Sequence, residues 1–285
     1  MERHHWGGIA VILLIFAILS LGGIKNAGLP RLSYNKDQTP EQKLESQIRE
    51  VDKLIQAEKR KETESEYKDI VTLSQVNRST DPMREYALIK VSNSAKNPIL
   101  VTGWKLQSKT SGMSVNVPKG TYLFFTSTLN SEENVYLSAG DMMYLITGYS
   151  PNGISFKLNK CSGYLEQFQN FIPPLPNNCP YPRDEDLSKI ANITANDDCL
   201  DYIESFPNCR TQTGLLPVTW TYECKNFIET KLNYSSCVNT HKPDSDFYQH
   251  EWRIYLRRSA SIWKSRRENI ILYDNLGKIV DTLEY

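Results

Sequence analysis

An excess of charge of either sign, a histidine pair with the helix-face spacing of metal ligands and the common catalytic signatures are all missing from this 285-residue chain. Its 33 Lys and Arg residues balance 33 Asp and Glu residues, so the net charge predicts neither a nucleic-acid binder nor a partner for an acidic surface. The motifs G-x-S-x-G, G-x-x-x-x-G-K-[ST] and G-x-G-x-x-G do not occur. We therefore expect no catalytic residue, no metal site and no cofactor.

Cysteine is also absent from most of the chain. All six cysteines lie between Cys161 and Cys237, and none belongs to a C-x-x-C pair. An even, clustered set of this kind is typical of disulfides rather than zinc ligands. Because disulfides persist outside the cytosol, we expect the N-terminus to lie inside the cell and nearly all of the remaining chain outside.

One long uncharged stretch occurs, from Trp6 to Ile24. At about 1.5 Å per residue it spans roughly 28 Å, close to the ~30 Å hydrocarbon core of a bilayer. One interpretation is a cleaved signal peptide, with small residues at Asn26-Ala27-Gly28. The apolar part is longer than the ~7–15 residues of a signal peptide, which favours an uncleaved anchor. We expect residues 1–28 to form a single-pass membrane anchor that contacts the bilayer through residues 6–24.

After a linker at residues 29–39, apolar residues recur at helical spacing: Leu44, Ile48, Val51 and Ile55. Thr39 can cap the helix, with Pro40 at its first position, and helix-forming residues continue to Lys68. The apolar seam covers fewer than two heptads. A charged helical spacer at residues 40–68 is therefore favoured over a homodimer through residues 44–55, although both interpretations stay open.

From residue 69 to residue 160 the pattern alternates with a period of two, in short runs separated by turn-forming residues. Many short strands without helices between them predict a β-sandwich or barrel. The alternation stops at Cys161 and resumes near residue 249, so residues 161–248 are interpreted as a cysteine-rich helical insert and residues 249–285 as closing strands. The terminal hairpin, Asn269 to Tyr285, is barely stable alone, so we expect it to pair with strands before Cys161.

Several of these short runs resemble the lamin-tail domain, an immunoglobulin-like β-sandwich. The residues that carry the resemblance are Glu85-Tyr86, Asn93, Gly103-Trp104-Lys105-Leu106, Leu137-Ser138-Ala139-Gly140-Asp141, Met143-Tyr144-Leu145, Leu272-Tyr273-Asp274, Gly277, Val280-Asp281 and Tyr285. The resemblance covers roughly residues 84–159 and 251–285. It implies a structural or interaction module of the bacterial membrane-anchored type, without catalytic residues, and it leaves the insert unexplained. Independently of the resemblance, Trp104 is predicted to pack in the core and Gly277 to adopt a positive φ.

Six cysteines allow fifteen pairings. Residues 197–209 predict a short helix capped by Asp197, and residues 217–237 predict a second helix joined to it by a short loop. If the two helices are antiparallel, the pairs are Cys199–Cys237, Cys209–Cys224 and Cys161–Cys179. Pairing between sequence neighbours is the main alternative.

Three segments of the insert and closing strands are candidate sites. His241, Asp244, Asp246, His250 and Glu251 have side chains that bind metals or transfer protons, but their spacing favours solvated loop residues and a helix cap. The second segment carries a group of basic residues: Arg253, Arg257, Arg258, Lys264, Arg266 and Arg267. This basic group could bind an anionic polymer, although a solvated strand face is favoured. Tyr164, Phe168 and Phe171 could line a groove for a peptide or sugar, although docking of the insert is favoured.

Together these patterns predict a mainly β protein. An immunoglobulin-like, lamin-tail-like sandwich carries a disulfide-bonded helical insert and follows a transmembrane helix and a helical spacer. The function we expect is a membrane-anchored extracytoplasmic interaction module, with an unknown protein or envelope polymer as its partner. The alternatives are an envelope enzyme, such as a metal-dependent hydrolase with its site at the insert–sandwich junction, or a module that binds nucleic acid or glycan.

Overall fold

The computed structural model describes residues 39–126, 129–187 and 196–285. The expected membrane anchor at residues 1–28 and most of the linker lie outside the described residues. Within the described ranges, no helix is both long enough and apolar enough to span a bilayer. The chain divides at Gln56 into two compact units, which are described separately.

The first helix, α2, runs from Pro40 to Thr63. Thr39 and Gln42 cap its start reciprocally: the Gln42 amide donates to Thr39 Oγ1 at 3.4 Å, and the Thr39 amide donates to Gln42 Oε1 at 3.1 Å. The expected continuation to Lys68 is wrong. The Ser65 amide donates to the carbonyl of Ile279 at 2.8 Å, and this pairing with a terminal strand draws the chain out of the helix.

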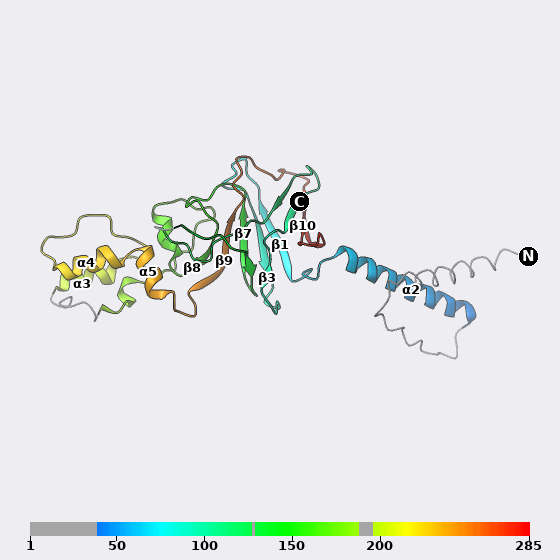
Figure 1. The fold of residues 1–285 in the computed structure, drawn as a ribbon, viewed down its shortest axis with the longest axis horizontal. Helices are drawn as coiled ribbons and strands as arrows, with labels where there is room; N and C mark the ends of the chain where they lie inside the picture. The colour runs from blue at the N-terminus through cyan, green and yellow to red at the C-terminus, as the bar shows by residue number, and fades with distance from the viewer. Residues whose placement is uncertain (1–38, 127–128, 188–195) are drawn as a thin grey trace, which may run out of the picture. The chain divides into compact units, whose positions relative to one another are not determined.

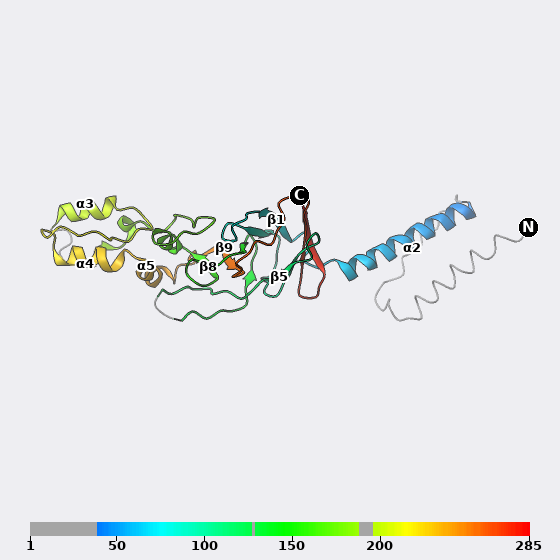
Figure 2. The ribbon, with the colours of Figure 1, turned by 90° about the horizontal axis from the view of Figure 1, so that it is seen from above.

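Residues 57–285 are mainly β, with helices in the cysteine-rich region (Figures 1 and 2). A five-stranded sheet has the order β1-β2-β7-β9-β8, a four-stranded sheet has the order β11-β10-β4-β5, and β3 pairs with β6. The strands are β1 (Val71–Asn77), β2 (Tyr86–Val91), β3 (Ile99–Leu100), β4 (Lys105–Ser108), β5 (Ser114–Asn116), β6 (Tyr136–Leu137), β7 (Met142–Ile146), β8 (Phe156–Asn159), β9 (Tyr248–Tyr255), β10 (Asn269–Tyr273) and β11 (Ile279–Glu284).

The strands β9 and β10 pair with strands that precede Cys161. β10 is antiparallel to β4, with Leu272 opposite Leu106, and it also forms the terminal hairpin with β11. β9 is parallel to β7 and antiparallel to β8. The expected pairing of the terminal hairpin with upstream strands is therefore confirmed.

The larger core cluster takes buried side chains from both large sheets. Trp104 lies in it with 1% of its surface exposed, and its ring centroid is 5.5 Å from that of Tyr67. Gly277 has a φ of +74° and Gly103 a φ of +89°. A Cβ at Gly103 would lie 2.7 Å from Asn275 Oδ1, so this turn needs glycine. The expectations for Trp104 and Gly277 are confirmed.

The insert connects β8 to β9, which are neighbours in the larger sheet. Its elements are η1 (Ser162–Gln167), η2 (Pro182–Asp184), α3 (Asp197–Ser205), α4 (Tyr222–Lys231) and α5 (Tyr234–His241). In Figures 1 and 2, α5 lies between α4 and β8. Asn196, rather than Asp197, caps α3, and its side chain accepts the Cys199 amide at 3.1 Å. The expected single second helix is two helices, because Asn233 caps a new one, with its side chain accepting the Ser236 amide at 2.9 Å.

All six cysteines form disulfides, but each of the three expected pairs is wrong. The bonds are Cys161–Cys237, Cys179–Cys209 and Cys199–Cys224. Two features explain the difference. The break at Asn233 separates Cys237 from α4, and the connection over residues 206–221 is long enough to bring the first turn of α4 to the first turn of α3.

Candidate functional site

The junction between the insert and the larger sheet has its own apolar core. Ile146, Phe156 and Tyr255 of the sheet are buried together with Tyr164 and Phe171 of the insert. The rings of Phe156 and Phe171 are 5.9 Å apart in an edge-on arrangement. The aromatic segment after Cys161 therefore docks the insert, as the sequence favoured. Phe168 is the exception, with 63% of its surface exposed.

Arg253 on β9 fastens the same junction with a buried charge. Its side chain is 2% exposed and its Nε donates to Glu251 Oε1 at 2.6 Å. Its two terminal nitrogens donate to the carbonyls of Pro173 at 2.5 Å and Pro174 at 3.1 Å, and its guanidinium lies 4.5 Å from the Tyr144 ring centre. Burial raises the pKa of Glu251, and the charge of Arg253 opposes this effect. Arg253, held by Glu251, therefore fixes the segment at Pro173 and Pro174 against the sheet.

This arrangement corrects the expectation of a solvated strand face at β9. Arg253 and Tyr255 are each 2% exposed, because the insert covers the face that strand alternation assigned to solvent. Arg257 forms an ion pair with Glu132. Among the remaining members of the basic group, Arg258 is half-buried, while Lys264, Arg266 and Arg267 are exposed in the loop before β10. The structure thus removes Arg253 from any solvent-facing basic patch.

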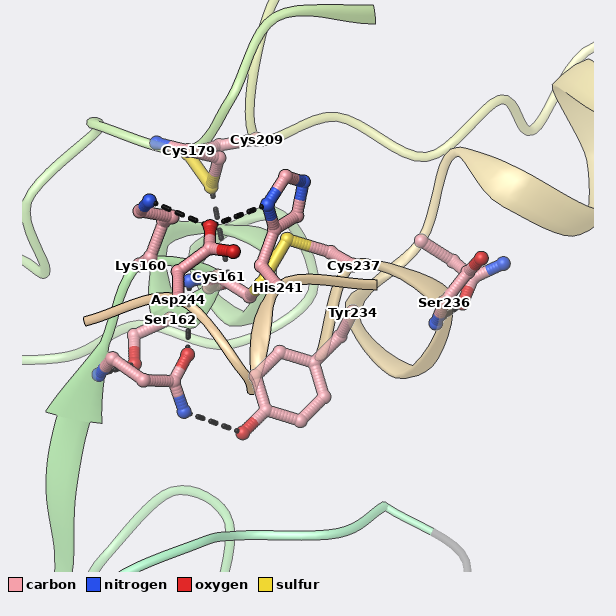
Figure 3. Close-up of a disulfide and its surroundings, with 12 residues drawn as sticks. Lys160, Cys161, Ser162, Cys179, Cys209, Tyr234, Ser236, Cys237, His241 and Asp244 are labelled. Carbon is pink, nitrogen blue, oxygen red and sulfur yellow. Dashed lines mark hydrogen bonds and ion pairs between the residues drawn. A yellow bond between two sulfur atoms is a disulfide. The ribbon is translucent and has the colours of Figure 1, made fainter. Parts of the chain in front are cut away.

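A second charged cluster surrounds His241 at the end of α5, next to the Cys161–Cys237 bond (Figure 3). His241 Nδ1 lies 2.9 Å from Asp244 Oδ2, and its Nε2 lies 2.9 Å from Glu185 Oε1. Lys160 Nζ donates to Asp244 at 2.9 Å and to Asp246 at 2.6 Å. Burial lowers the pKa of His241, but the hydrogen bonds to Glu185 and Asp244 outweigh it and leave the pKa raised.

The other acid–base candidates are held in separate pairs. His250 Nδ1 lies 2.6 Å from Oδ1 of Asp141, whose other oxygen accepts from Lys157 Nζ at 3.1 Å. Glu251 pairs with Arg253. The described ranges contain no group of three or more His, Cys, Asp and Glu side chains placed to hold a metal ion. The structure therefore does not bring His241, His250 and Glu251 together.

An open groove of about 500 Å³ lies where the insert meets the loops of the sheet. Its apolar lining is Phe124, Tyr164, Leu165, Phe168 and Tyr234. Its polar lining is Thr126, Asn152, Gln169, Thr211, Asn233 and Ser235. No charged side chain among the described residues lines the groove. Its volume falls within the ~300–1,000 Å³ of small-molecule sites.

Sequence reasoning named Tyr164 and Phe168 but missed the polar side of this groove. Asn152 lies in a turn before β8, and Tyr234 begins α5, so neither shares a sequence pattern with the aromatic segment. Tyr234 is placed by two hydrogen bonds: its hydroxyl donates to the Phe124 carbonyl at 2.9 Å and accepts from Asn159 Nδ2 at 3.1 Å. Only the folded insert brings these segments together.

Compared with known proteins, the chain matches no family model, no curated protein and no solved structure.

Proposed function

We propose that this chain is a membrane-anchored extracytoplasmic interaction module that presents the disulfide-bonded insert to a partner. The observation that carries the proposal is the state of the six cysteines, all of which are disulfide-bonded and lie in the insert. Disulfides of this kind persist in oxidising compartments. The uncharged stretch from Trp6 to Ile24 supplies the anchor in this proposal, and α2 follows it along the chain.

The proposal includes a lamin-tail-like, immunoglobulin-like sandwich formed by the two large sheets. Two of the resembling segments make tight turns, which supports the likeness. Asp141 accepts the Ser138 amide at 2.9 Å before β7, and Asp274 accepts the amides of Leu276 and Lys278 at 2.8 and 3.0 Å. The core shared by both sheets is further support.

A binding role is favoured over catalysis by the way the junction uses its ionisable side chains. His241, Glu251 and Arg253 are each engaged with partners that fasten the insert to itself or to the sheet. Groups committed to such pairs stabilise a shape, and a rigid shape lowers the entropic cost of binding a partner. The partner we propose is an extracytoplasmic protein or an envelope polymer.

The compartment is tested in intact cells that produce the full chain. We expect the chain to sediment with membranes, and a membrane-impermeant maleimide to label its cysteines only after an impermeant reductant is added. Labelling that needs cell lysis but no reductant would place the cysteines in the cytosol and refute the proposal. The mass of the membrane-bound chain separates the two readings of the N-terminus, because an uncleaved anchor retains the full 32.8 kDa.

A further inference from the structure

We propose that the groove lined by Phe168, Asn152 and Gln169 binds a neutral saccharide. This inference deepens the proposed function, since it gives the chemical class of the partner and rests on the role of an interaction module. It stands on four observations: an exposed aromatic ring, a lining without charge, two unpaired polar atoms and a fixed frame.

The exposed ring is the first observation. Phe168 follows η1 and is 63% exposed, while its neighbours Tyr164 and Leu165 are almost fully buried in the junction. Phe168 also lines the groove, so its exposed ring is available to a ligand that enters there. The C–H face of a pyranose ring is flat and apolar, so it can stack on such an aromatic face.

The lining selects a neutral ligand. Besides its apolar members, the described residues that line the groove have amide and hydroxyl side chains, and none is Asp, Glu, Lys, Arg or His. Amides and hydroxyls both donate and accept hydrogen bonds, which suits a ligand rich in hydroxyl groups. An acidic polymer would find no cation in this groove, so the lining favours a neutral sugar over an anionic one.

Two polar atoms in the lining lack partners. Asn152 Nδ2 and Gln169 Oε1 are shielded from solvent and have no hydrogen-bond partner in the part of the chain that the structure describes. A buried unpaired polar group is costly and calls for an explanation. One of these atoms only donates and the other only accepts, and a hydroxyl group can satisfy either one. Asn152 Oδ1 already accepts from Ser150 Oγ and from the Ile154 amide, so a sugar hydroxyl is needed only at its Nδ2 and at Gln169 Oε1.

The frame of the groove is held by contacts across the junction. The Thr126 and Ser235 hydroxyls lie 3.2 Å apart and link a sheet loop to α5. The Gln167 side chain exchanges hydrogen bonds with the backbone of Thr211 at 2.7 and 3.0 Å. A groove held open by such contacts binds with a smaller loss of conformational entropy.

The test uses the full chain, solubilised in a detergent without a sugar headgroup so that the detergent does not compete. Titration calorimetry and ligand-observed NMR are run with neutral chito-, cello-, manno- and malto-oligosaccharides, with polygalacturonate and with blocked neutral tripeptides. We expect at least one neutral oligosaccharide to bind with an affinity that does not change between low and high salt, because no ion pair is involved.

Phe168→Ala should weaken this binding about tenfold or more, the loss expected for a truncated central aromatic contact. Tyr222→Ala is the matched control, since Tyr222 is 75% exposed on α4 and does not line the groove. Gln169→Glu should also weaken binding by replacing the neutral amide with a charge. If both alanine variants melt at the same temperature as the wild type, the fold is unchanged.

The proposal is overturned if no neutral saccharide binds, if only the peptides or polygalacturonate bind, or if Phe168→Ala and Tyr222→Ala bind equally. Each of these results leaves the disulfide-bonded, extracytoplasmic module standing, because that role is read from thiol labelling. Conversely, if thiol labelling places the cysteines in the cytosol, the proposal of an extracytoplasmic module is refuted, whatever the groove binds.

Discussion

At the scale of single residues, Arg253 joins the sheet to the insert through a buried charge. The guanidinium is buried and engages one carboxylate, two carbonyls and one aromatic ring. Arg253→Met leaves the carboxylate of Glu251 buried without its partner. Breaking a buried pair in this way costs about 3–5 kcal/mol of unfolding free energy, which urea denaturation measures.

The matched control for Arg253→Met is Arg257→Met, two residues past the end of β9. Arg257 pairs with Glu132, but its side chain is 49% exposed. A solvent-exposed pair contributes about 0–1 kcal/mol, so we expect little change. Similar losses for the two variants would contradict the idea that Arg253 fastens the insert. The double variant Arg253→Met with Glu251→Leu should recover part of the loss, because it removes the unpaired charge.

His241 should make the stability of the insert depend on pH. Its pKa is raised in the folded protein, because the hydrogen bonds to Glu185 and Asp244 outweigh the effect of burial. The group therefore stabilises the fold fully below its unfolded pKa of about 6.5, and the contribution is lost as the pH rises through the folded pKa. Relative to His241→Gln, the wild type should be more stable by about 1 kcal/mol near pH 5.5, and this advantage should shrink by pH 8.5.

Thermal unfolding across this pH range measures the effect, with two charge-matched variants as controls. Glu185→Gln removes a carboxylate that contacts His241 and should reduce the pH dependence. Asp184→Asn removes an exposed neighbouring carboxylate and should leave it intact. A wild-type advantage over His241→Gln that grows with rising pH has the wrong sign for this mechanism.

At the scale of elements, the insert replaces the turn of an antiparallel pair. Because β8 and β9 are neighbours, the chain leaves and re-enters the sheet at adjacent points. The Lys160 amide donates to the Phe247 carbonyl at 2.8 Å, so the base of the insert is closed by backbone as well. The bond Cys161–Cys237, with Cα atoms 5.9 Å apart, joins the first cysteine to the last.

Disulfide mapping tests this closure directly. Trypsin combined with a glutamate-specific protease separates the six cysteines, because Glu204 lies between Cys199 and Cys209. Under non-reducing conditions we expect three cross-linked peptides, which contain Cys161–Cys237, Cys179–Cys209 and Cys199–Cys224. A peptide that joins Cys199 to Cys237 would contradict the fold of the insert. Replacing both members of one bond by alanine should cost about 2–4 kcal/mol.

β11 ties the terminal hairpin to the larger sheet. It pairs with β10 along its length, and its Asp281 carboxylate accepts the Leu73 amide of β1 at 2.7 Å. Deleting Ile279–Tyr285 leaves β10 with an unpaired edge and opens the core at Val280. We expect the truncated chain to lose its cooperative melting transition, measured by near-ultraviolet circular dichroism. Leu276→Ala, in the exposed turn, should melt like the wild type, and a cooperative transition in the truncated chain would refute this role.

Features that depend on residues close in sequence could be predicted from the sequence. Features that depend on packing between distant segments could not. The alternation of β10 and β11 and the turn at Gly277 depend on neighbouring residues, so the terminal hairpin was predictable. The disulfide pairs depend on the break at Asn233 and on a long connection that carries no periodic pattern. The burial of Arg253 was hidden for a similar reason, because strand alternation cannot show that an insert covers the second face. The groove combines residues from five separate segments, and sequence reasoning reached only one of them.

At the scale of the whole molecule, the open question is whether one chain pairs with another through α2. Leu44 and Ile48 are 55% and 44% exposed, so the apolar seam has no partner within the described chain. A seam of fewer than two heptads is too short for a stable coiled coil in dilute solution. We therefore expect the chain to be monomeric in detergent at micromolar concentration. A shared bilayer raises the effective concentration of the helices, so the same seam should support a dimer there.

Amine cross-linking of the full chain in vesicles, at high and low protein density, measures this dimer. Ile48→Glu places a charge in the seam and should reduce the cross-linked dimer about fivefold, since a coupling loss of about 1 kcal/mol suffices for that change. Ala57→Glu adds the same charge on the opposite side of α2 and should have no effect. Cross-linking that is equal in the two variants would identify α2 as a spacer that holds single chains away from the membrane.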